Sequence, residues 1–355
     1  EEFIRAASLA STNEIRNAFN HEKPGYYELA LFLSPAARPL LEEMAVLAHE
    51  KTVKRFGHTM SLFTPLYVSN DCINSCAYCS FNRHLNIDLK TLTMEELENE
   101  CKAIKEEGFS HLLLVSSENP QKAGVDYLKK SVEVAKKYFE QVVIEFYTLD
   151  EESYKTLKNS GVDGVTLFQE TYSQEVYARF HPAGPKKDFE KRLKTMDMAA
   201  RAGIKKLNLG SLLGLNDFRE EALYLAFHAN YLKKNYWQSE VAISFSRIRK
   251  NTGNFQPPVP VSDADFAQMI LAMRLFDENL SLVLSTRETE SFRNSMARLG
   301  ITSMSAGAKT NPGGYTGKKS ESQFKISDER TPSEISKYLE SIGYDVVWKD
   351  WEYGI

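Results

Sequence analysis

The sequence predicts an α/β fold: an eight-stranded parallel barrel of the (β/α)8 TIM type with an extension at each end. From residue 65 on, short apolar runs alternate with longer segments of helical periodicity. There are eight such runs, and each is followed by its own crossover, which favours a closed parallel barrel over an open doubly wound sheet. The length of 355 residues is long for most single domains but ordinary for such a barrel.

The eight expected strands share an apolar, β-rich composition and lie at residues 65–70, 111–116, 142–148, 164–169, 205–213, 241–248, 280–286 and 301–308. Helical periodicity lies between them at residues 94–107, 122–139, 187–202, 222–234, 263–278 and 288–299. Gly108, Gly203 and Gly300 fall where helices should end, because glycine readily adopts the left-handed conformation that closes a helix.

Both extensions are short. Before the barrel, the pattern predicts helices at residues 11–19, 25–32 and 36–55, the last of which should pack against the barrel. After it, the pattern predicts a turn at 312–315, a helix at 332–342 and an apolar strand at 345–351. The chain therefore divides into an N-terminal helical extension at 1–60, a barrel at 61–310 and a C-terminal extension at 311–355.

Composition excludes several classes of protein. The chain is 42% hydrophobic and 26% charged, which is typical of globular proteins. A net charge of -4 argues against a nucleic-acid surface, which needs a basic field. No apolar run approaches a membrane span, and the first residues lack the pattern of a signal peptide. Four cysteines, three of them in one motif, are no disulfide framework, so we expect a cytoplasmic protein.

Cys72, Cys76 and Cys79 form a C-x3-C-x2-C motif directly after the first expected strand. Three thiolates at this spacing can hold three corners of a [4Fe-4S] cluster and leave the fourth iron open to a small molecule. A zinc site would need a second pair of cysteines or histidines, and Cys101 stands alone in a helical pattern as a core residue would. The alternative of three buried cysteines with a structural role is disfavoured, because the segment is polar. The motif therefore predicts an iron–sulfur cluster.

Charged residues recur at the carboxyl ends of the expected strands, which is where barrel enzymes carry their chemistry. One such charge could belong to a solvated surface. Charges or polar groups after six of the eight strands instead predict a functional barrel mouth, with Glu118, Glu145, Glu170, Arg247 and Arg287 among them.

The cysteine motif after an apolar strand resembles that of the radical S-adenosylmethionine (SAM) enzymes, in which SAM binds the open iron and yields methionine and a 5'-deoxyadenosyl radical. Longer stretches resemble the aromatic amino-acid lyases of that superfamily, above all the tyrosine lyases of bacterial thiazole (thiamine) synthesis. These stretches run from about residue 35 to the end and include residues 66–70, 165–172, 181–189, 213–215, 236–237, 243–245, 285–288, 305–310 and 347–351.

The resemblance implies cleavage of the Cα–Cβ bond of L-tyrosine to 2-iminoacetate and 4-cresol, with SAM as co-substrate. It also implies thiazole synthase and a flavodoxin- or ferredoxin-type reductant as partners. The related lyases of hydrogenase maturation carry further cysteines for a second iron site, which this sequence lacks. Two alternatives stay open: a related lyase acting on tryptophan, and a non-catalytic, cluster-bearing partner of thiazole synthase.

Matching positions imply roles in binding SAM. Tyr78 would contact the adenine through its backbone, Glu118 the amino group, Glu145 the ribose hydroxyls and Arg192 the carboxylate. Two of these residues have plainer interpretations: Glu145 as an ion-pair partner within its strand, and Arg192 as a charge on a helix surface. Where this chain has Ser117, most relatives have glycine, and the added side chain puts the role of Glu118 in question.

Other matching positions imply roles toward the amino acid. Arg287 would bind the tyrosine carboxylate, because a planar guanidinium offers two parallel donors to a planar pair of oxygens. Tyr67 and Ser305 would help to position the substrate. Arg247 and Arg249 are interpreted as plain ion-pair partners and are left out of the site.

Overall fold

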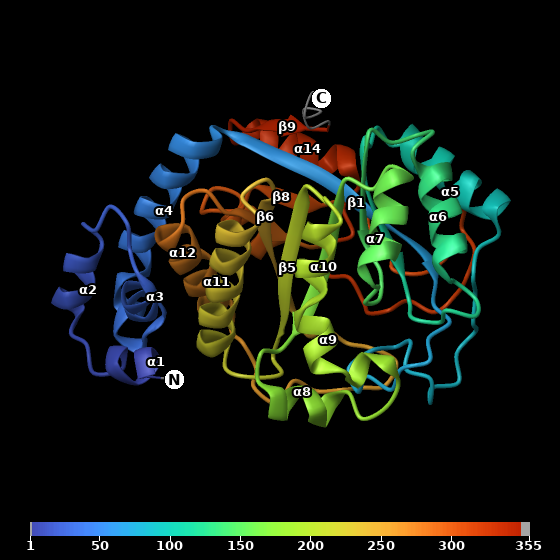
Figure 1. Ribbon diagram of the computed structural model, residues 1–355. Coiled ribbons are helices and arrows are strands. Elements are labelled where there is room, and N and C mark those ends of the chain that lie inside the picture. Colours follow the sequence, from blue (N-terminus) through green and yellow to red (C-terminus); the bar gives the residue numbers. More distant parts are fainter. Residues whose placement is uncertain (1, 349–355) are drawn as a thin grey trace.

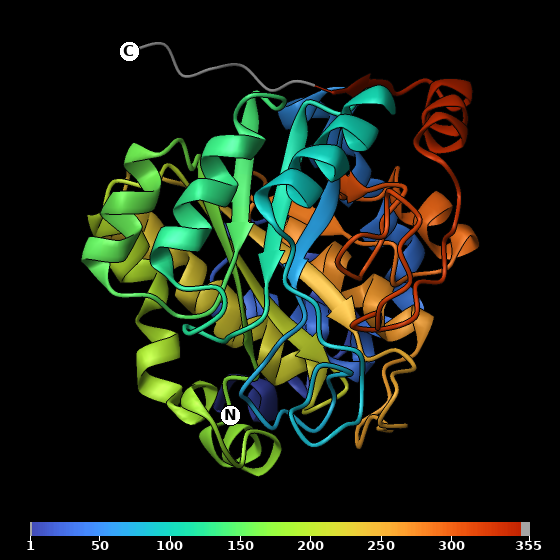
Figure 2. The same cartoon turned by 90° about the vertical axis from the view of Figure 1, so that its right-hand side faces the viewer.

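The computed structural model describes residues 2–348, and its centre is a closed ring of eight parallel strands surrounded by helices (Figures 1 and 2). Each strand pairs in parallel with the next, and β1 also pairs with both β2 and β8, which closes the ring. The predicted barrel is thereby confirmed. Its strands are β1 (Thr59–Ser69), β2 (His111–Ser116), β3 (Gln141–Glu145), β4 (Gly164–Glu170), β5 (Lys206–Leu213), β6 (Glu240–Arg247), β7 (Ser281–Leu284) and β8 (Ser303–Ser305).

Outer helices follow their strands as the periodicity predicts: α5 (Met94–Glu106), α6 (Val125–Ala135), α11 (Phe218–Asn235), α12 (Asp263–Phe276) and α13 (Glu290–Met296). The helix after β3, α7 (Glu151–Asn159), lies outside the predicted helical segments. Local capping explains their starts. The Thr93 hydroxyl accepts from the Glu96 backbone amide while the Glu96 carboxylate accepts from that of Thr93, so α5 begins in a capping box. Ser262 and Asp265 do the same for α12.

The segment between β4 and β5 differs from its prediction. The single helix expected at 187–202 is interrupted and consists of η2 (Pro185–Lys187), α9 (Phe189–Leu193) and α10 (Thr195–Arg201). Asp188 caps α9 by accepting from the Lys191 backbone amide, which starts a new helix after η2. A further short helix, α8 (Gln174–Phe180), precedes them, and the periodicity of the sequence does not predict it.

The N-terminal helices α1 (Glu2–Ala7), α2 (Thr12–Ala18), α3 (Tyr26–Leu33) and α4 (Leu41–Phe56) lie together against one side of the barrel (Figure 1). α3 and α4 both contact α12. The helix expected at 36–55 begins later than predicted, because residues Pro35–Leu40 form the 3-10 turn η1 around Pro39. The predicted boundary near residue 60 stays a prediction, as does the one at residue 310.

The C-terminal helix α14 (Pro332–Ser341) and strand β9 (Asp345–Val347) lie at the end of the barrel where β1 begins (Figure 1). β9 pairs in parallel with the first residues of β1, with Asp345 opposite Thr59. The remainder of the strand expected at 345–351 extends beyond the described residues from position 349 on.

Side chains alternate along the strands between the helical layer and the barrel interior. Leu112 and Leu114 of β2 join the main hydrophobic core, whereas Leu113 and Val115 face a cavity inside the barrel. This cavity has a volume of about 430 Å³ and extends to the carboxyl ends of the strands. The barrel interior is therefore partly open and offers a lined space to a ligand.

A segment without regular helix or strand, residues 309–328, crosses the mouth of the barrel; we call it the C-terminal strap. Its backbone is tied to the loops that follow three different strands: Ser80 N donates to Gln323 O, Lys325 N to Lys250 O, and Ser327 N to Thr286 O. The strap therefore forms part of the wall around the barrel mouth.

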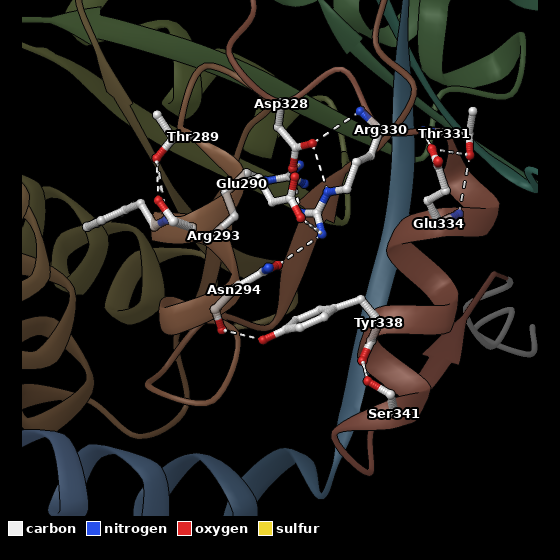
Figure 3. A network of polar contacts seen from close by, with 12 residues as sticks. Thr289, Glu290, Arg293, Asn294, Asp328, Arg330, Thr331, Glu334, Tyr338 and Ser341 are labelled. Atoms are coloured by element: carbon white, nitrogen blue, oxygen red, sulfur yellow. Dashed lines mark hydrogen bonds and ion pairs between the residues drawn. The ribbon is translucent and has the colours of Figure 1, made fainter.

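A buried ion pair fastens the end of the strap (Figure 3). Asp328 binds the guanidinium of Arg293 on α13 and, at 2.7 Å, Nη2 of Arg330. The side chains of Asp328 and Arg293 are buried. Although burial opposes it, the hydrogen bond from Arg330 and the charge of Arg293 hold the pKa of Asp328 below its usual value. Arg293 also donates to the Ser305 carbonyl at 2.5 Å, so the pair joins the strap to β8.

Replacing Asp328 by asparagine should destabilise the protein by about 3 kcal/mol, because it leaves Arg293 buried without its counter-charge. The free energy of unfolding, measured by urea denaturation and circular dichroism, tests this. Glu329→Gln, an exposed neighbour with the same chemical change, should cost little. Equal losses in the two variants would contradict the importance of the pair.

Candidate active site at the barrel mouth

The three cysteines lie in the loop that leaves β1, and backbone and side-chain amides approach two of their sulfurs. Phe81 N lies 3.4 Å from the Cys79 sulfur, and Asn74 Nδ2 lies 3.6 Å from that of Cys72. Asn82 Nδ2 donates to the Cys76 carbonyl at 3.1 Å and closes the turn between the last two cysteines. The loop is thus shaped by its own polar contacts.

The cysteine sulfurs suit a metal cluster. Burial raises the pKa of Cys76 to about 12 and that of Cys79 to about 11, so the thiolates need a positive partner at this place. Amide donors beside thiolates are a regular feature of iron–sulfur sites. Within residues 2–348 no group of three Cys, His, Asp or Glu side chains is arranged to hold a single metal ion. Three cysteines in one loop, with amides beside two of the sulfurs, suit the protein ligands of an iron–sulfur cluster.

Asn74 connects the cysteine loop to two neighbouring segments. Its Nδ2 donates to Glu118 Oε2 at 2.7 Å, and its Oδ1 accepts from the backbone amide of Lys186 at 2.9 Å. Gly184 makes the close approach possible, because a Cβ there would lie 2.3 Å from Asn74 Oδ1, and its φ of +92° also favours glycine. Glu118 thereby lies beside the cysteine loop.

Ser117 directs its hydroxyl to the loop backbone. Its Oγ donates to the Asp71 carbonyl at 2.7 Å, and its backbone amide donates to the Ser69 carbonyl at 3.1 Å. The Ser117 side chain therefore adds a contact that holds the cysteine loop. The Glu118 carboxylate keeps its hydrogen bond from Asn74.

The end of β4 carries a buried charge cluster. Glu170 binds Lys186 Nζ at 2.6 Å and Arg192 Nη2 at 3.4 Å. Arg192 Nε donates to the Phe168 carbonyl at 2.7 Å, and only 7% of Arg192 is exposed. The alternative of Arg192 as a surface charge is therefore wrong. Although burial opposes it, Lys186 and Arg192 hold the pKa of Glu170 below its usual value.

Glu170 itself has a φ of +74°, which is unusual for a residue with a side chain. It follows a break in the β4–β5 register between Phe168 and Glu170. Such a conformation costs on the order of 1–3 kcal/mol and persists where surrounding contacts fix it. The ion pairs to Lys186 and Arg192 are those contacts here.

Tyr78, between Cys76 and Cys79, is held by its side chain. His181 Nδ1 donates to the Tyr177 carbonyl at 2.7 Å, which leaves Nε2 to accept from the Tyr78 hydroxyl at 2.7 Å. Burial lowers the pKa of His181 to about 3, so the ring stays neutral. The Tyr78 hydroxyl is therefore engaged within the protein.

The three residues expected to bind the amino acid, and Glu145 from those expected to bind SAM, meet in the cavity inside the barrel. Tyr67, Glu145, Arg287 and Ser305 all line it. Tyr78, Glu118, Arg192 and the cysteines lie outside this lining; Cys72 and Cys79 pack against the cluster of hydrophobic residues that includes Tyr67. The structure thus separates the predicted residues into a cavity group and a group around the cysteine loop.

Arg287 and Glu145 are the charged groups at the end of the cavity that lies nearest the carboxyl ends of the strands. The Arg287 guanidinium lies 3.4 Å from the centre of the Phe324 ring and forms no hydrogen bond or ion pair within residues 2–348. Burial raises the pKa of Glu145 to about 7, although Arg287 opposes the shift. The ion-pair alternative for Glu145 is not realised within the described chain, since its carboxylate approaches no cation to 4.0 Å. Both groups remain available to a ligand.

Several residues of the site were missed from the sequence. Asn74 lies inside the cysteine motif, and Lys186 lies in a stretch already compared with relatives, so their positions offered a signal. Gln323 and Phe324 lie in the strap, where no periodicity or motif marks them. Arg247 and Arg249 both pair with the buried Glu288, which confirms them as ion-pair partners.

Comparisons with known proteins agree with this arrangement. The chain matches the radical SAM superfamily over residues 66–226 and the biotin and thiamin synthesis associated domain over residues 244–345. It is 40% identical over 341 residues to the 2-iminoacetate synthases of Salmonella typhimurium and Escherichia coli, covering 96% of this chain and 90% of theirs. No helix within residues 2–348 has the length and apolarity required to cross a membrane.

The fold is also close to solved structures. HydG, a maturase of the [FeFe]-hydrogenase, superposes with a TM-score of 0.92 at 32% identity, over 98% of this chain and 79% of that protein. HydG from Carboxydothermus hydrogenoformans gives 0.90 at 29% identity, over 98% and 82% of the two chains. Methylornithine synthase, at 19% identity and a TM-score of 0.72, shares the fold.

Glu145 should make stability depend on pH. Its pKa of about 7 in the folded protein lies above the ordinary 4.5, so the folded protein holds the extra proton between those values. The free energy of unfolding must then fall as pH rises through this window and level off above about pH 7. From pH 5 to pH 8, the wild type should lose roughly 2–3 kcal/mol more than Glu145→Gln. Parallel urea-denaturation curves at both pH values would contradict this.

Proposed function

The chain belongs to the 2-iminoacetate synthase family of radical SAM enzymes, and we propose that it cleaves the Cα–Cβ bond of L-tyrosine to 2-iminoacetate and 4-cresol. The observation that carries this proposal is 40% identity over nearly the whole of both chains. Cys72, Cys76 and Cys79 would hold a [4Fe-4S] cluster, which together with SAM would supply the radical for the reaction, with methionine and 5'-deoxyadenosine as co-products.

Four residues are assigned to SAM. Glu118, fixed beside the cysteine loop by Asn74, takes the amino group, and Glu145 takes the ribose hydroxyls. Tyr78 contacts the adenine through its backbone. Arg192 takes the carboxylate: within the described residues its Nε donates to Phe168 and one N–H of Nη2 to Glu170, so the N–H groups of Nη1 and the second one of Nη2 are left for it.

Arg287 is assigned to the carboxylate of the substrate. It lies at the upper end of the cavity, and the Phe324 ring lies against its guanidinium face, which leaves the edge with its paired N–H groups for hydrogen bonding. Tyr67 and Ser305 line the same cavity and help to place the amino acid.

The chain's own contribution is to hold the amino nitrogen next to the reacting carbon of SAM and to keep other hydrogen donors away. A carboxylate held at two points restricts the orientation of the amino acid. The entropic cost of bringing the reacting atoms together is then met by binding. The cavity accepts the ring between apolar side chains such as Phe63, Leu113 and Val283. The strap excludes water from the reacting atoms by covering the mouth.

We further propose thiazole synthase as the acceptor of the product, because an imine hydrolyses readily in water. A flavodoxin- or ferredoxin-type protein would supply the electron. We place the enzyme in the cytoplasm, since all four cysteines are free in the structure and a cluster with an open iron requires a reducing compartment.

Reconstituted without oxygen and given SAM and a reductant, the protein should form 4-cresol from tyrosine in step with 5'-deoxyadenosine, both measured by liquid chromatography. Tryptophan in place of tyrosine tests the alternative lyase. Deoxyadenosine without cresol would refute the tyrosine assignment and leave the cluster chemistry intact. A cluster whose paramagnetic spectrum ignores SAM would point to the non-catalytic alternative.

Arg287→Lys should lower kcat/KM for cresol formation roughly 10- to 100-fold, because an ammonium cannot replace two parallel N–H donors to a carboxylate. Formation of 5'-deoxyadenosine should change only a few-fold. Arg179→Lys is a matched control, since that exposed guanidinium also lies over a phenylalanine ring, Phe180. Equal loss of both products would contradict the role of Arg287 in binding the carboxylate.

A further inference from the structure

Gln323 of the strap lies between a substrate-binding residue and a cysteine of the cluster motif. The Tyr67 hydroxyl donates to Gln323 Oε1 at 2.7 Å, and Gln323 Nε2 points to the Cys79 sulfur at 3.9 Å. One amide thus connects β1 at the cavity to the loop that carries the cysteines.

The sulfur decides the direction of this chain of hydrogen bonds. A cysteine sulfur bound to iron carries no proton and only accepts, so the amide turns its NH2 group toward Cys79 and its oxygen toward Tyr67. The reverse orientation would place Oε1 against the sulfur, two acceptors facing each other. With the amide oriented by the sulfur, Tyr67 has to donate its single proton to Gln323.

Tyr67 therefore presents only an acceptor to the cavity. Of the two polar ends of an amino acid, the amino group is the one that can donate to it, whereas a carboxylate would meet a second acceptor. Arg287, which has only donors, selects the carboxylate instead. The two side chains together distinguish one end of the substrate from the other.

The strap holds both of these residues through adjacent positions. Gln323 N donates to the Thr310 carbonyl at 2.9 Å, and Gln323 O accepts from Ser80 N at 3.4 Å, directly after Cys79 in the sequence. The next residue, Phe324, lies against Arg287 at 3.4 Å. The dipeptide Gln323–Phe324 is thus a common support for the two groups.

We propose that Gln323 is a positioning residue that couples the cluster ligand Cys79 to Tyr67 and so fixes Tyr67 as the acceptor for the substrate amino group. This inference rests on the proposed function for the identity of the substrate. A donor beside a thiolate ligand also stabilises the more negative, reduced cluster and raises its reduction potential. Gln323 therefore affects two properties that can be measured separately.

The test is Gln323→Met, which keeps the size of the side chain and removes both hydrogen bonds. In protein reconstituted without oxygen, the midpoint potential of the cluster, followed by electron paramagnetic resonance without tyrosine, should become more negative. KM for tyrosine should rise by about tenfold, as expected for the loss of one hydrogen bond to a substrate group. Lys325→Met, the same kind of change at an exposed strap residue, should alter neither.

A double-mutant comparison tests the coupling itself. Tyr67→Phe should raise KM for tyrosine without shifting the potential, and adding Gln323→Met should raise KM little further, because both changes remove the same contact. Independent, additive effects on KM would overturn the proposal, as would an unchanged potential in Gln323→Met.

Two controls separate other causes of failure. If Gln323→Met does not retain iron, Gln323→Asn, which shortens the side chain and keeps its polarity, must give the same shifts. If the wild type forms no cresol from tyrosine, the proposed function fails, whereas the shift in potential is measured without tyrosine and decides separately whether Gln323 acts on Cys79.

Discussion

The cost of burying charge governs the architecture of the barrel mouth. An ionised group removed from water requires a partner of opposite charge. Removing one partner leaves the other buried and unpaired, which destabilises the folded protein by several kcal/mol. Three carboxylates at the strand ends or on the strap meet this demand: Glu170 with Lys186 and Arg192, Glu288 with Arg247 and Arg249, and Asp328 with Arg293 and Arg330. Each cluster joins segments that are distant in the sequence.

Two charged residues of the cavity differ from the paired residues of these clusters. Arg287 and Glu145 form no ion pair within residues 2–348, and both face the same cavity. Burial without a bound partner destabilises the charged form of each: it lowers the pKa of Arg287 and raises that of Glu145. The residues that the structure leaves unsatisfied are the ones assigned to the substrate and to SAM, as is expected where binding energy is reserved for a ligand.

The sequence predicts the barrel and the cysteine site well, because both have local signals. Parallel strands covered on both faces read as apolar runs, and the three cysteines lie within eight positions of one another. The burial of Arg192 could not be read from Lys191-Arg192-Leu193, since the break before α9 resets which face of the helix points inward. Gln323 and Phe324 are placed at the site by contacts distant in the sequence, Gln323 with Thr310 and Ser80 and Phe324 with Thr310, which no local pattern encodes.

The position of the strap in the chain has a consequence for biosynthesis. All eight barrel strands end by Ser305, and the strap follows at residues 309–328. During synthesis the barrel strands therefore leave the ribosome before the segment that covers them. At ordinary elongation speeds the interval is roughly 1–4 s. During that time the side of the cysteine loop that later meets Gln323 has no cover from the strap.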